Sequence, residues 1–369
     1  MGRLLGAGLV AAALAVVIAA PASATGPGKN GKVIYTNGAN TIVANADGTS
    51  PQTVLSNGAW GPAWSPDGRR FVAILSGNVW TYDAAGGDPV QVTTLGSDET
   101  PSWSPDGTRI VFGRALADRE AIFSMDASGV GVAKQLSKPG SGYFDFSPAW
   151  SPDGTRIAFN RDKNHVAKTY DIWIMKANGK SPVKLFKDAN FNGYPAWSPD
   201  SKRIAYEQAS GAKTLIQTRA TGGGKAKTVV SGVAYEPEYS PDGTRILYQT
   251  AAGQIRTIPV NGGRSKLIAA VGAGPGWQPA CNQTAPPAGG TITGTAKPEL
   301  LCGDEGPDTI NAGGGDDHAF GFGGADVLNG SAGNDTLVGG DEDDTFNGGP
   351  GSDACVQGAG TGAKTACER

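Results

Sequence analysis

The phrase Trp150-Ser151-Pro152-Asp153-Gly154 decides the fold of this chain, because it recurs along most of the sequence. Further copies are the truncated form Trp277-Gln278-Pro279 and four versions with at most one residue changed, at residues 64–68, 103–107, 197–201 and 239–243. Successive copies begin 38 to 47 residues apart. Self-similarity at such a period is typical of stacked supersecondary units, so each copy marks one part of an array.

Each repeat has the pattern of four short antiparallel strands. Ser-Pro-Asp-Gly suits a type I turn, because Ser can accept hydrogen bonds at the first position and Pro presets φ at the second. Alternating runs follow, such as residues 156–159 and 171–175, then a turn at Gly179 and a short run at 183–185. Four strands in about 40 residues predict one propeller blade.

The two ends of the array predict how the ring closes. The N-terminal part supplies three strands, at residues 32–36, 40–44 and 52–55, with no Pro-x-Trp strand before them. Residues 274–279 supply one Pro-x-Trp strand with nothing after it. That strand can complete the first blade, and the prediction is a closed six-bladed propeller without an unpaired inner edge.

Composition agrees with an all-β protein and bounds its partners. The chain of 369 residues contains 57 Gly and 24 Pro, which favours short strands joined by turns over long helices. Residues 303–356 carry twelve Asp and Glu and no Lys or Arg. A nucleic-acid partner is disfavoured, because no Lys/Arg cluster with interleaved aromatic residues occurs and the acidic tail would repel phosphate.

The N-terminus and the cysteines predict an extracellular protein. Arg3, an apolar run at residues 4–20 and Ala22-Ser23-Ala24 form the pattern of a secretory signal peptide at residues 1–24, with an uncleaved anchor as the alternative. No later stretch is apolar for the ~18 residues that a membrane span needs. Four cysteines allow three pairings, and we predict Cys281 with Cys302 and Cys355 with Cys367, each closing a short loop.

Residues 148–159, Pro-Ala-Trp-Ser-Pro-Asp-Gly-Thr-Arg-Ile-Ala-Phe, resemble the repeat of TolB-type propellers, which have WD-like repeats. The resemblance covers about residues 30–280 and implies a propeller domain at residues 25–281. Such propellers serve as protein-binding platforms, as domains appended to peptidases and, in a few relatives, as lyases. Fold alone does not choose among these roles.

The repeated charged residues are expected to be structural. In five turns the Asp is followed three positions later by an Arg, and a pair present five times is more economically a turn-stabilising ion pair than a catalytic one. The five predicted pairs are Asp67–Arg70, Asp106–Arg109, Asp153–Arg156, Asp200–Arg203 and Asp242–Arg245. The repeated Trp residues are expected to face the core.

A binding site is therefore sought where the blades differ, just before each Pro-x-Trp strand. Innermost strands of a propeller begin at a channel mouth, where aromatic and acidic side chains could bind a protein or a glycan. The candidate mouth residues are Trp60, Asp98, Glu99, Tyr143, Asp145, Tyr194, Tyr235 and Glu236. The alternative is that these side chains only pack the loops and solvate the rim.

Catalytic motifs are scarce, and we predict a binding protein without catalytic residues. The sequence has no GxSxG motif and only two histidines, His165 and His318. The alternative function is a secreted carbohydrate-active or peptide-processing enzyme with carboxylates at the propeller mouth, such as Asp98 or Glu236.

A second repeat, nine residues long, follows a predicted linker at residues 282–300 and fills residues 303–356 in constant phase. Its sixth position is always Asp and its eighth is apolar or small, while glycines recur at the fourth. Glycines allow positive φ, and carboxylate and carbonyl oxygens suit Ca²⁺. The predicted metal-site residues are Asp308, Asp317, Asp326, Asp335, Asp344 and Asp353, with Gly306, Gly315, Gly324, Gly333 and Gly351.

These nonapeptides resemble the haemolysin-type calcium-binding RTX repeats, which form a parallel β-roll with two repeats in each turn. The resemblance implies a short parallel β-roll of three turns at residues 301–369, with a C-terminal cysteine cap and calcium as the cofactor. Because unneutralised carboxylates repel one another, the tail is expected to fold only on binding calcium. Glu342, in place of a fourth-position Gly, makes the fifth repeat a weaker site.

Overall fold

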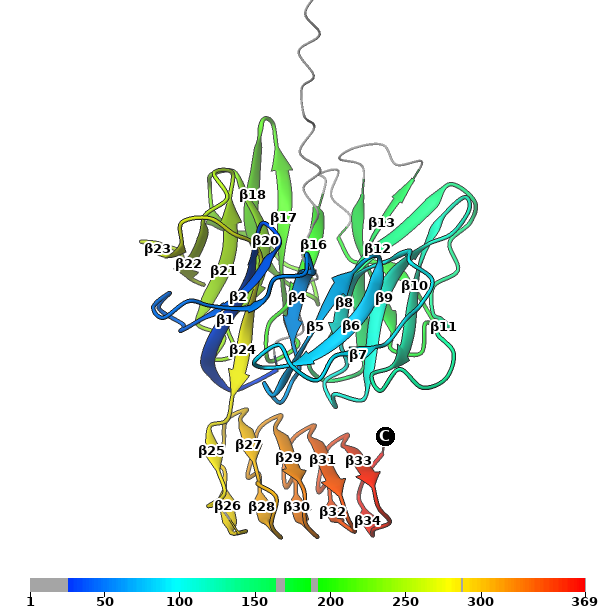
Figure 1. Ribbon diagram of the computed structural model, residues 1–369, viewed down its shortest axis with the longest axis vertical. Helices are drawn as coiled ribbons and strands as arrows, with labels where there is room; N and C mark the ends of the chain where they lie inside the picture. The colour runs from blue at the N-terminus through cyan, green and yellow to red at the C-terminus, as the bar shows by residue number, and fades with distance from the viewer. Residues whose placement is uncertain (1–25, 164–169, 187–191, 287, 369) are drawn as a thin grey trace, which may run out of the picture.

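The computed structural model describes residues 26–163, 170–186, 192–286 and 288–368, and all of the secondary structure in these residues consists of strands. Figure 1 shows a propeller above, made of residues 29–280, and a roll below, made of residues 283–365. No helix in the described part of the chain could cross a membrane. The predicted signal peptide lies outside the described residues.

The propeller has six blades of four antiparallel strands each, as predicted, and a parallel pairing of Glu120 with Phe144 joins the third and fourth blades into one eight-stranded sheet. Blade 1 consists of β24 (Ala273–Ala280), β1 (Lys29–Asn37), β2 (Asn40–Ala44) and β3 (Gln52–Leu55). Blades 2 and 3 consist of β4 (Trp60–Trp64), β5 (Arg70–Leu75), β6 (Asn78–Asp83) and β7 (Val90–Gln91), and of β8 (Asp98–Trp103), β9 (Arg109–Ala115), β10 (Glu120–Asp126) and β11 (Lys134–Gln135). Blade 4 consists of β12 (Tyr143–Trp150), β13 (Arg156–Lys163), β14 (Asp171–Lys176) and β15 (Val183–Lys184). Blades 5 and 6 consist of β16 (Asn192–Trp197), β17 (Arg203–Ser210), β18 (Lys213–Ala220) and β19 (Lys227–Val230), and of β20 (Ala234–Tyr239), β21 (Arg245–Thr250), β22 (Ile255–Pro259) and β23 (Lys266–Ala269).

Strands from both ends of the propeller close the ring. β24 pairs antiparallel with β1, where Val33 faces Trp277, and this confirms the predicted closure. The first strand of each blade contacts the first strand of the next, and β24 contacts β4, so these strands surround the axis. Trp64, Trp197 and Trp277 are fully buried, which is the predicted core-facing role of the repeated tryptophans.

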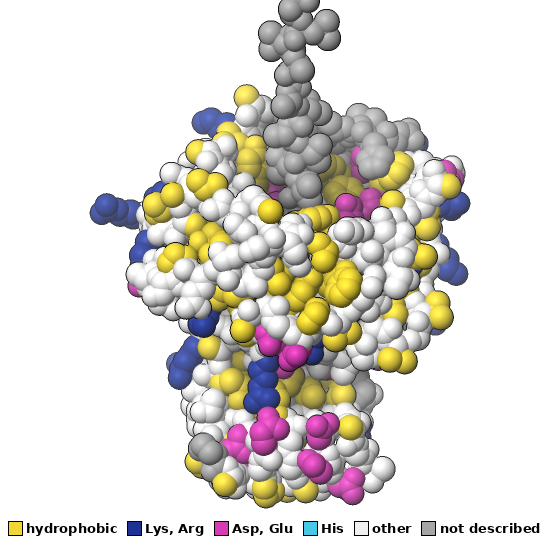
Figure 2. All heavy atoms as spheres, viewed as in Figure 1, with side chains coloured by type: hydrophobic (Ala, Val, Ile, Leu, Met, Phe, Trp, Pro, Cys, Tyr) yellow, Lys and Arg dark blue, Asp and Glu magenta, His cyan; other side chains and the backbone are white. Residues whose placement is uncertain are grey.

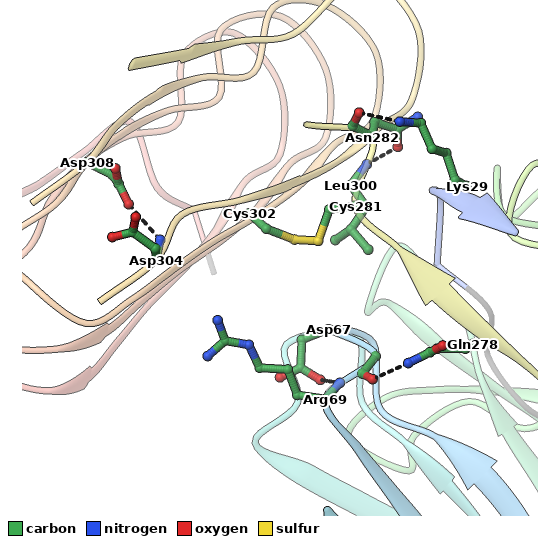
Figure 3. The surroundings of a disulfide bond; sticks show 11 residues. Lys29, Asp67, Arg69, Gln278, Cys281, Asn282, Leu300, Cys302, Asp304 and Asp308 are labelled. Carbon is green, nitrogen blue, oxygen red and sulfur yellow. Dashed lines mark hydrogen bonds between the residues drawn. A yellow bond between two sulfur atoms is a disulfide. The ribbon is translucent and has the colours of Figure 1, made fainter. Parts of the chain in front are cut away.

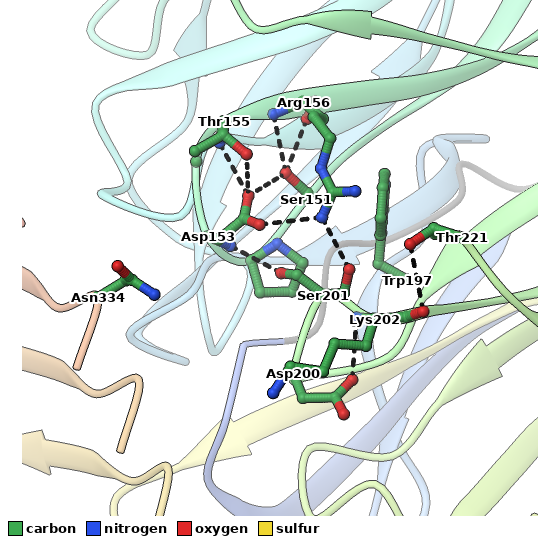
Figure 4. A network of polar contacts seen from close by, with 12 residues as sticks. Ser151, Asp153, Thr155, Arg156, Trp197, Asp200, Ser201, Lys202, Thr221 and Asn334 are labelled. Atoms are coloured by element: carbon green, nitrogen blue, oxygen red, sulfur yellow. Dashed lines mark hydrogen bonds and ion pairs between the residues drawn. The ribbon is translucent and has the colours of Figure 1, made fainter. Parts of the chain in front are cut away.

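Each Ser-Pro-Asp-Gly turn is closed by its own side chains. In blade 4 the Gly154 N–H donates to the Ser151 carbonyl at 2.9 Å, and the Ser151 hydroxyl donates to Asp153 Oδ1 at 2.6 Å. Ser151 Oγ also accepts from the backbone N–H of Arg156 at 3.0 Å (Figure 4). Gly154 has a φ of 68°, a left-handed conformation that favours glycine.

The predicted Asp–Arg ion pairs are wrong for four of the five turns. Within the described ranges only Arg156 reaches its aspartate, with Nη2 3.0 Å from Asp153 Oδ2. The other four arginines donate to a hydroxyl on the neighbouring strand, namely Arg70 to Thr81, Arg109 to Ser124, Arg203 to Thr218 and Arg245 to Thr257. The turn aspartate is already bonded to the Ser hydroxyl and to a backbone N–H two residues on, so it needs no arginine.

The roll consists of two parallel five-stranded sheets. One contains β25 (Gln283–Thr284), β27 (Leu300–Cys302), β29 (His318–Phe322), β31 (Thr336–Asp341) and β33 (Ala354–Ala359). The other contains β26 (Thr291–Thr293), β28 (Thr309–Asn311), β30 (Val327–Asn329), β32 (Thr345–Asn347) and β34 (Lys364–Thr365). Strands pair with those 18 residues away, so the eighth-position side chains stack between the sheets as Ile310, Ala319, Leu328, Leu337, Phe346 and Cys355.

The roll is longer than predicted, and residues 282–300 are not a linker. They form its first turn, because Gln283 pairs with Leu301 and Ile292 with Ile310 at the same spacing of 18 residues. The roll therefore begins at residue 283 and has about five turns instead of three. The signal was hidden because Gly290 and Glu299 occupy the sixth positions, where the repeat otherwise has Asp.

One disulfide links the roll to the propeller, and a second closes the far end of the roll. Cys281 pairs with Cys302 and Cys355 with Cys367, which confirms the predicted pairing. The first bridge joins the residue after β24 to β27 (Figure 3). A cavity of about 680 Å³ lies at the same junction and has walls from both parts, including Arg203 and Lys297.

The propeller face that carries the Ser-Pro-Asp-Gly turns packs on the outer side of one roll sheet. Arg69 lies 3.2 Å from the centre of the Phe322 ring and pairs with Glu305 at 3.3 Å. His318 is buried, with Nε2 3.1 Å from the Pro152 carbonyl oxygen. The innermost strands therefore begin on the face of the propeller opposite to the roll.

Replacing Trp277 with Ala is expected to lower the free energy of unfolding by about 3–5 kcal/mol, because the change leaves a cavity where the ring closes. Trp277 is 1% exposed and packs with Val33 and Ile255. Urea unfolding in calcium, followed by circular dichroism, measures the loss. Trp80→Ala, at a half-buried site on β6, is the control. An equal loss in both variants would show that closure does not depend on Trp277.

Candidate functional site

The six predicted metal-site aspartates form two stacks along the roll, called the aspartate columns here. All six are at most 2% exposed. One column contains Asp308, Asp326 and Asp344, and the other contains Asp317, Asp335 and Asp353. Each later carboxylate accepts, through Oδ1, the backbone N–H of the aspartate one turn earlier, at 2.7–3.0 Å. One oxygen of each carboxylate thus holds successive turns together.

The second carboxylate oxygen is left over at three of these residues. Oδ2 of Asp317, Asp326 and Asp335 is buried without a hydrogen-bond partner among the described residues. Burial is the main cause that raises the pKa of Asp317 to about 8 and those of Asp326 and Asp335 to about 7, and neighbouring carboxylates add to it. A buried anion of this kind requires a cation or a proton.

The second carboxylate oxygens occupy space that a side chain would fill if the neighbouring glycines had a Cβ. A Cβ added at Gly321 or Gly330 would collide with Oδ2 of Asp326 or Asp335. Four of the five predicted fourth-position glycines have positive φ, namely Gly315, Gly324, Gly333 and Gly351, whereas Gly306 does not. Glu342 takes the same position with a φ of 67°, so the backbone of the fifth repeat keeps the course of the others.

These residues fit calcium. Their free oxygens are carboxylates in a glycine-lined setting, and calcium prefers oxygen ligands in irregular geometry. In the described part of the chain no three acidic, His or Cys side chains converge as a metal centre. Bound calcium would supply positive charge that neutralises the carboxylates. Figure 2 shows acidic side chains spread over the lower part of the molecule, where the roll lies.

At the other end of the molecule, two predicted mouth carboxylates are occupied by arginines. Asp98 accepts two hydrogen bonds from Arg114, and Asp145 accepts two from Arg161 at 2.6 and 2.7 Å. Both aspartates are buried. We did not predict these arginines from the sequence, although each pair repeats with the same period of 47 residues that separates blades 3 and 4.

Three other predicted mouth residues converge with two glutamates that were missed. This axial cluster consists of Glu99, Glu120, Tyr194, Glu207 and Glu236. Burial, and then Glu99, raise the pKa of Glu120 to about 10. Burial is also the main cause that raises the pKa of Glu207, and it raises the pKa of Tyr194 together with Glu207 and Glu236. The members of the axial cluster come from blades 3, 5 and 6.

The remaining candidates lie outside the axial cluster. Trp60 packs against the apolar core between blades 2 and 3. Tyr143 lies near Lys163, whose Nζ is 5.7 Å from the ring centre, and Tyr235 is half-buried on β20. His165 lies outside the described residues. Glu120 lies on β10, the third strand of its blade, and Glu207 on β17, the second strand of its blade. An isolated Glu on these strands gives no signal in the sequence.

Comparison with known proteins identifies both repeats. The family model described as the TolB beta propeller domain matches residues 140–283. The model of the RTX calcium-binding nonapeptide repeat matches residues 293–321, 303–336 and 320–355. No curated protein matches the chain.

Solved structures share the propeller fold. TolB from Acinetobacter baumannii is 24% identical, with 68% of this chain and 67% of that chain covered and a TM-score of 0.58. A putative TolB from Agrobacterium tumefaciens is 18% identical, covers 66% of this chain and 89% of its own, and has a TM-score of 0.54. A chain of a nidogen/laminin complex is 12% identical, with 67% and 98% covered and a TM-score of 0.55. The protein therefore combines a TolB-type β-propeller with a roll of calcium-binding RTX repeats.

Proposed function

We propose that this is a secreted, non-catalytic binding protein, in which calcium folds the roll outside the cell and the propeller presents a site for a protein or glycan partner. The observation that carries the binding role is the axial cluster, where predicted mouth residues from three blades come together on the face opposite to the roll. Two disulfides and the RTX repeats are compatible with an extracellular location. Calcium at an extracellular concentration of ~10⁻³ M would suit such modules.

Binding is tested with the mature protein in millimolar calcium, on a glycan array and in pull-downs of proteins from the exterior of the producing cell. We expect a captured partner that the double variant Glu99→Gln/Tyr194→Ala, which changes two half-buried members of the axial cluster, binds at least about tenfold more weakly, a change of about 1.4 kcal/mol. Val132→Ala is the control, because Val132 is 91% exposed in the turn after β10 and far from the mouth. Unchanged binding in the double variant would remove the proposed role of the mouth. Turnover of a glycan or peptide, abolished in Glu236→Gln, would instead establish an enzyme.

A further inference from the structure

The innermost strand of every blade contains one residue in a left-handed conformation directly before a proline. These six residues have φ between 48° and 61° and are Gly61, Thr100, Ser147, Tyr194, Glu236 and Gly274. The strand pairing shifts register at the same place in all six blades. Because the first strands surround the axis, the six residues form one ring, called the pre-proline ring here.

Four blades keep a side chain where glycine would be easier. Gly61 and Gly274 adopt the conformation without strain, since they lack a Cβ. Thr100, Ser147, Tyr194 and Glu236 adopt it against the preference of L-residues, and Thr is β-branched and the least suited of the four. All four carry an oxygen atom in the side chain. Strained residues of this kind cluster at active sites and ligand clamps.

Several oxygens of the ring and the axial cluster lack partners. Thr100 is 3% exposed and Ser147 is fully buried, and neither hydroxyl has a hydrogen-bond partner in the described ranges. Glu120 is 7% exposed, and its Oε1 also lacks a hydrogen-bond partner among the described residues. A Cβ added at Gly113 would lie 2.6 Å from Glu120 Oε1, 3.5 Å from Glu99 Cγ and 3.6 Å from Thr100 Oγ1. Two orphaned oxygens and a second carboxylate thus meet at one point.

The charge left over at this point is small. Asp98 and Asp145 are neutralised by Arg114 and Arg161. Burial raises the pKa of Glu120 to about 10, so this carboxyl holds a proton near neutral pH. The negative charge that remains suits one monovalent cation. Glu99 and Tyr194 are half-buried, so part of each side chain is accessible to solvent.

We propose that the pre-proline ring and Glu99 with Glu120 bind a primary ammonium group, as on a lysine side chain of the partner. An ammonium has three donors and no acceptor, which matches hydroxyl and carboxylate oxygens supplied singly by different residues. A guanidinium would favour a free bidentate carboxylate, and the two aspartates beside this point, Asp98 and Asp145, already hold arginines in that way. The rings of Phe146, Tyr170 and Tyr194, with centres 5.2–6.5 Å apart, add aromatic surface beside the cluster. This inference rests on the proposed binding function and specifies its ligand.

The test compares two small probes, Nα-acetyl-lysine methylamide and the same compound acetylated at Nε, by saturation-transfer NMR on the full chain in calcium. We expect the free amine to bind and the acetylated one to bind at least about tenfold more weakly, because acetylation removes the charge. Thr100→Gly and Glu120→Gln should each weaken binding of the amine at least fivefold. Thr100→Gly should also raise the thermal midpoint by about 1–3 °C, since it removes strain.

Ser76→Gly is the matched control, because Ser76 has a φ of 52° but lies exposed in the turn between β5 and β6. It should raise the midpoint in the same way and leave amine binding unchanged. Equal binding of both probes, or full binding by Thr100→Gly, would overturn the assignment while a captured partner still upheld the binding function. Amine binding without any captured partner would support the ring and count against the wider proposal.

Discussion

Removing calcium is expected to unfold residues 303–356 while the six blades stay folded. The two aspartate columns place buried carboxylates above one another at intervals of one turn, and without a cation their repulsion acts on a thin core. One site at a hundred times its dissociation constant contributes about 2.7 kcal/mol, which corresponds to about hundredfold in protection from hydrogen exchange. Two or more such sites would therefore decide whether the roll is folded.

Hydrogen exchange with mass spectrometry on the full chain, in calcium and in chelator, measures this directly. Peptides from β28–β32 should lose at least about hundredfold protection in chelator. Peptides from β12–β14 should not change, because their core contains no aspartate column. If the roll stays protected in chelator, its apolar core and two disulfides suffice and calcium is not needed for folding.

The stability of the roll is expected to depend on pH in opposite directions in chelator and in calcium. The folded pKa values of Asp317, Asp326 and Asp335 are raised to about 7–8, whereas an unfolded Asp titrates near ~3.9. Without calcium the folded roll therefore holds more protons, and its stability should be greatest below about pH 4 and decline as the pH rises to about 8. Calcium binds the deprotonated form, so in calcium stability should rise over the same range.

Thermal unfolding at pH 5 and pH 8 measures the reversal. In chelator the midpoint of the roll should be at least about 5 °C higher at pH 5, a shift that corresponds to about 1 kcal/mol for a domain of this size. The triple variant Asp317→Asn/Asp326→Asn/Asp335→Asn keeps the Oδ1 acceptors but cannot be charged. It should lose both the pH dependence and the response to calcium. Asp341→Asn, at an exposed site, should behave like the parent protein, and a triple variant that still responded to calcium would place the sites elsewhere.

The architecture followed from local signals that repeat. Ser-Pro-Asp-Gly specifies a turn through the conformations of Pro and Gly, and its five copies together with the truncated copy at Trp277 predicted the number of blades and the closing strand β24. The nonapeptide phase predicted both the aspartates and the apolar residues that stack in the roll. The same signal failed where the residue types changed but the spacing did not, at Gly290 and Glu299, and so the first turn of the roll was missed.

The chemistry of the propeller depended on contacts between strands, both within a blade and around the axis. The predicted mouth residues Asp98 and Asp145 turned out to be neutralised by arginines sixteen positions later in the chain. Glu120 and Glu207, which complete the axial cluster, belong to strands that the repeat does not distinguish from their neighbours. The first relation arises from strand register within a blade and the second from packing around the axis, so the repeated turn does not specify these partners.

The sequence alone determined the repeating units, the disulfide pairing and the type of metal that the roll takes, since each depends on residue types at fixed short spacings. Only the tertiary structure decided which oxygens remain free. In the roll, strand pairing at 18 residues uses one oxygen of each column aspartate and leaves the second oxygen of Asp317, Asp326 and Asp335 without a partner among the described residues. In the propeller, closure of the ring brings strained hydroxyls from separate blades to one axis. A buried oxygen without a hydrogen-bond partner costs free energy, and a bound cation would offset this cost both in the aspartate columns and at the axis of the propeller.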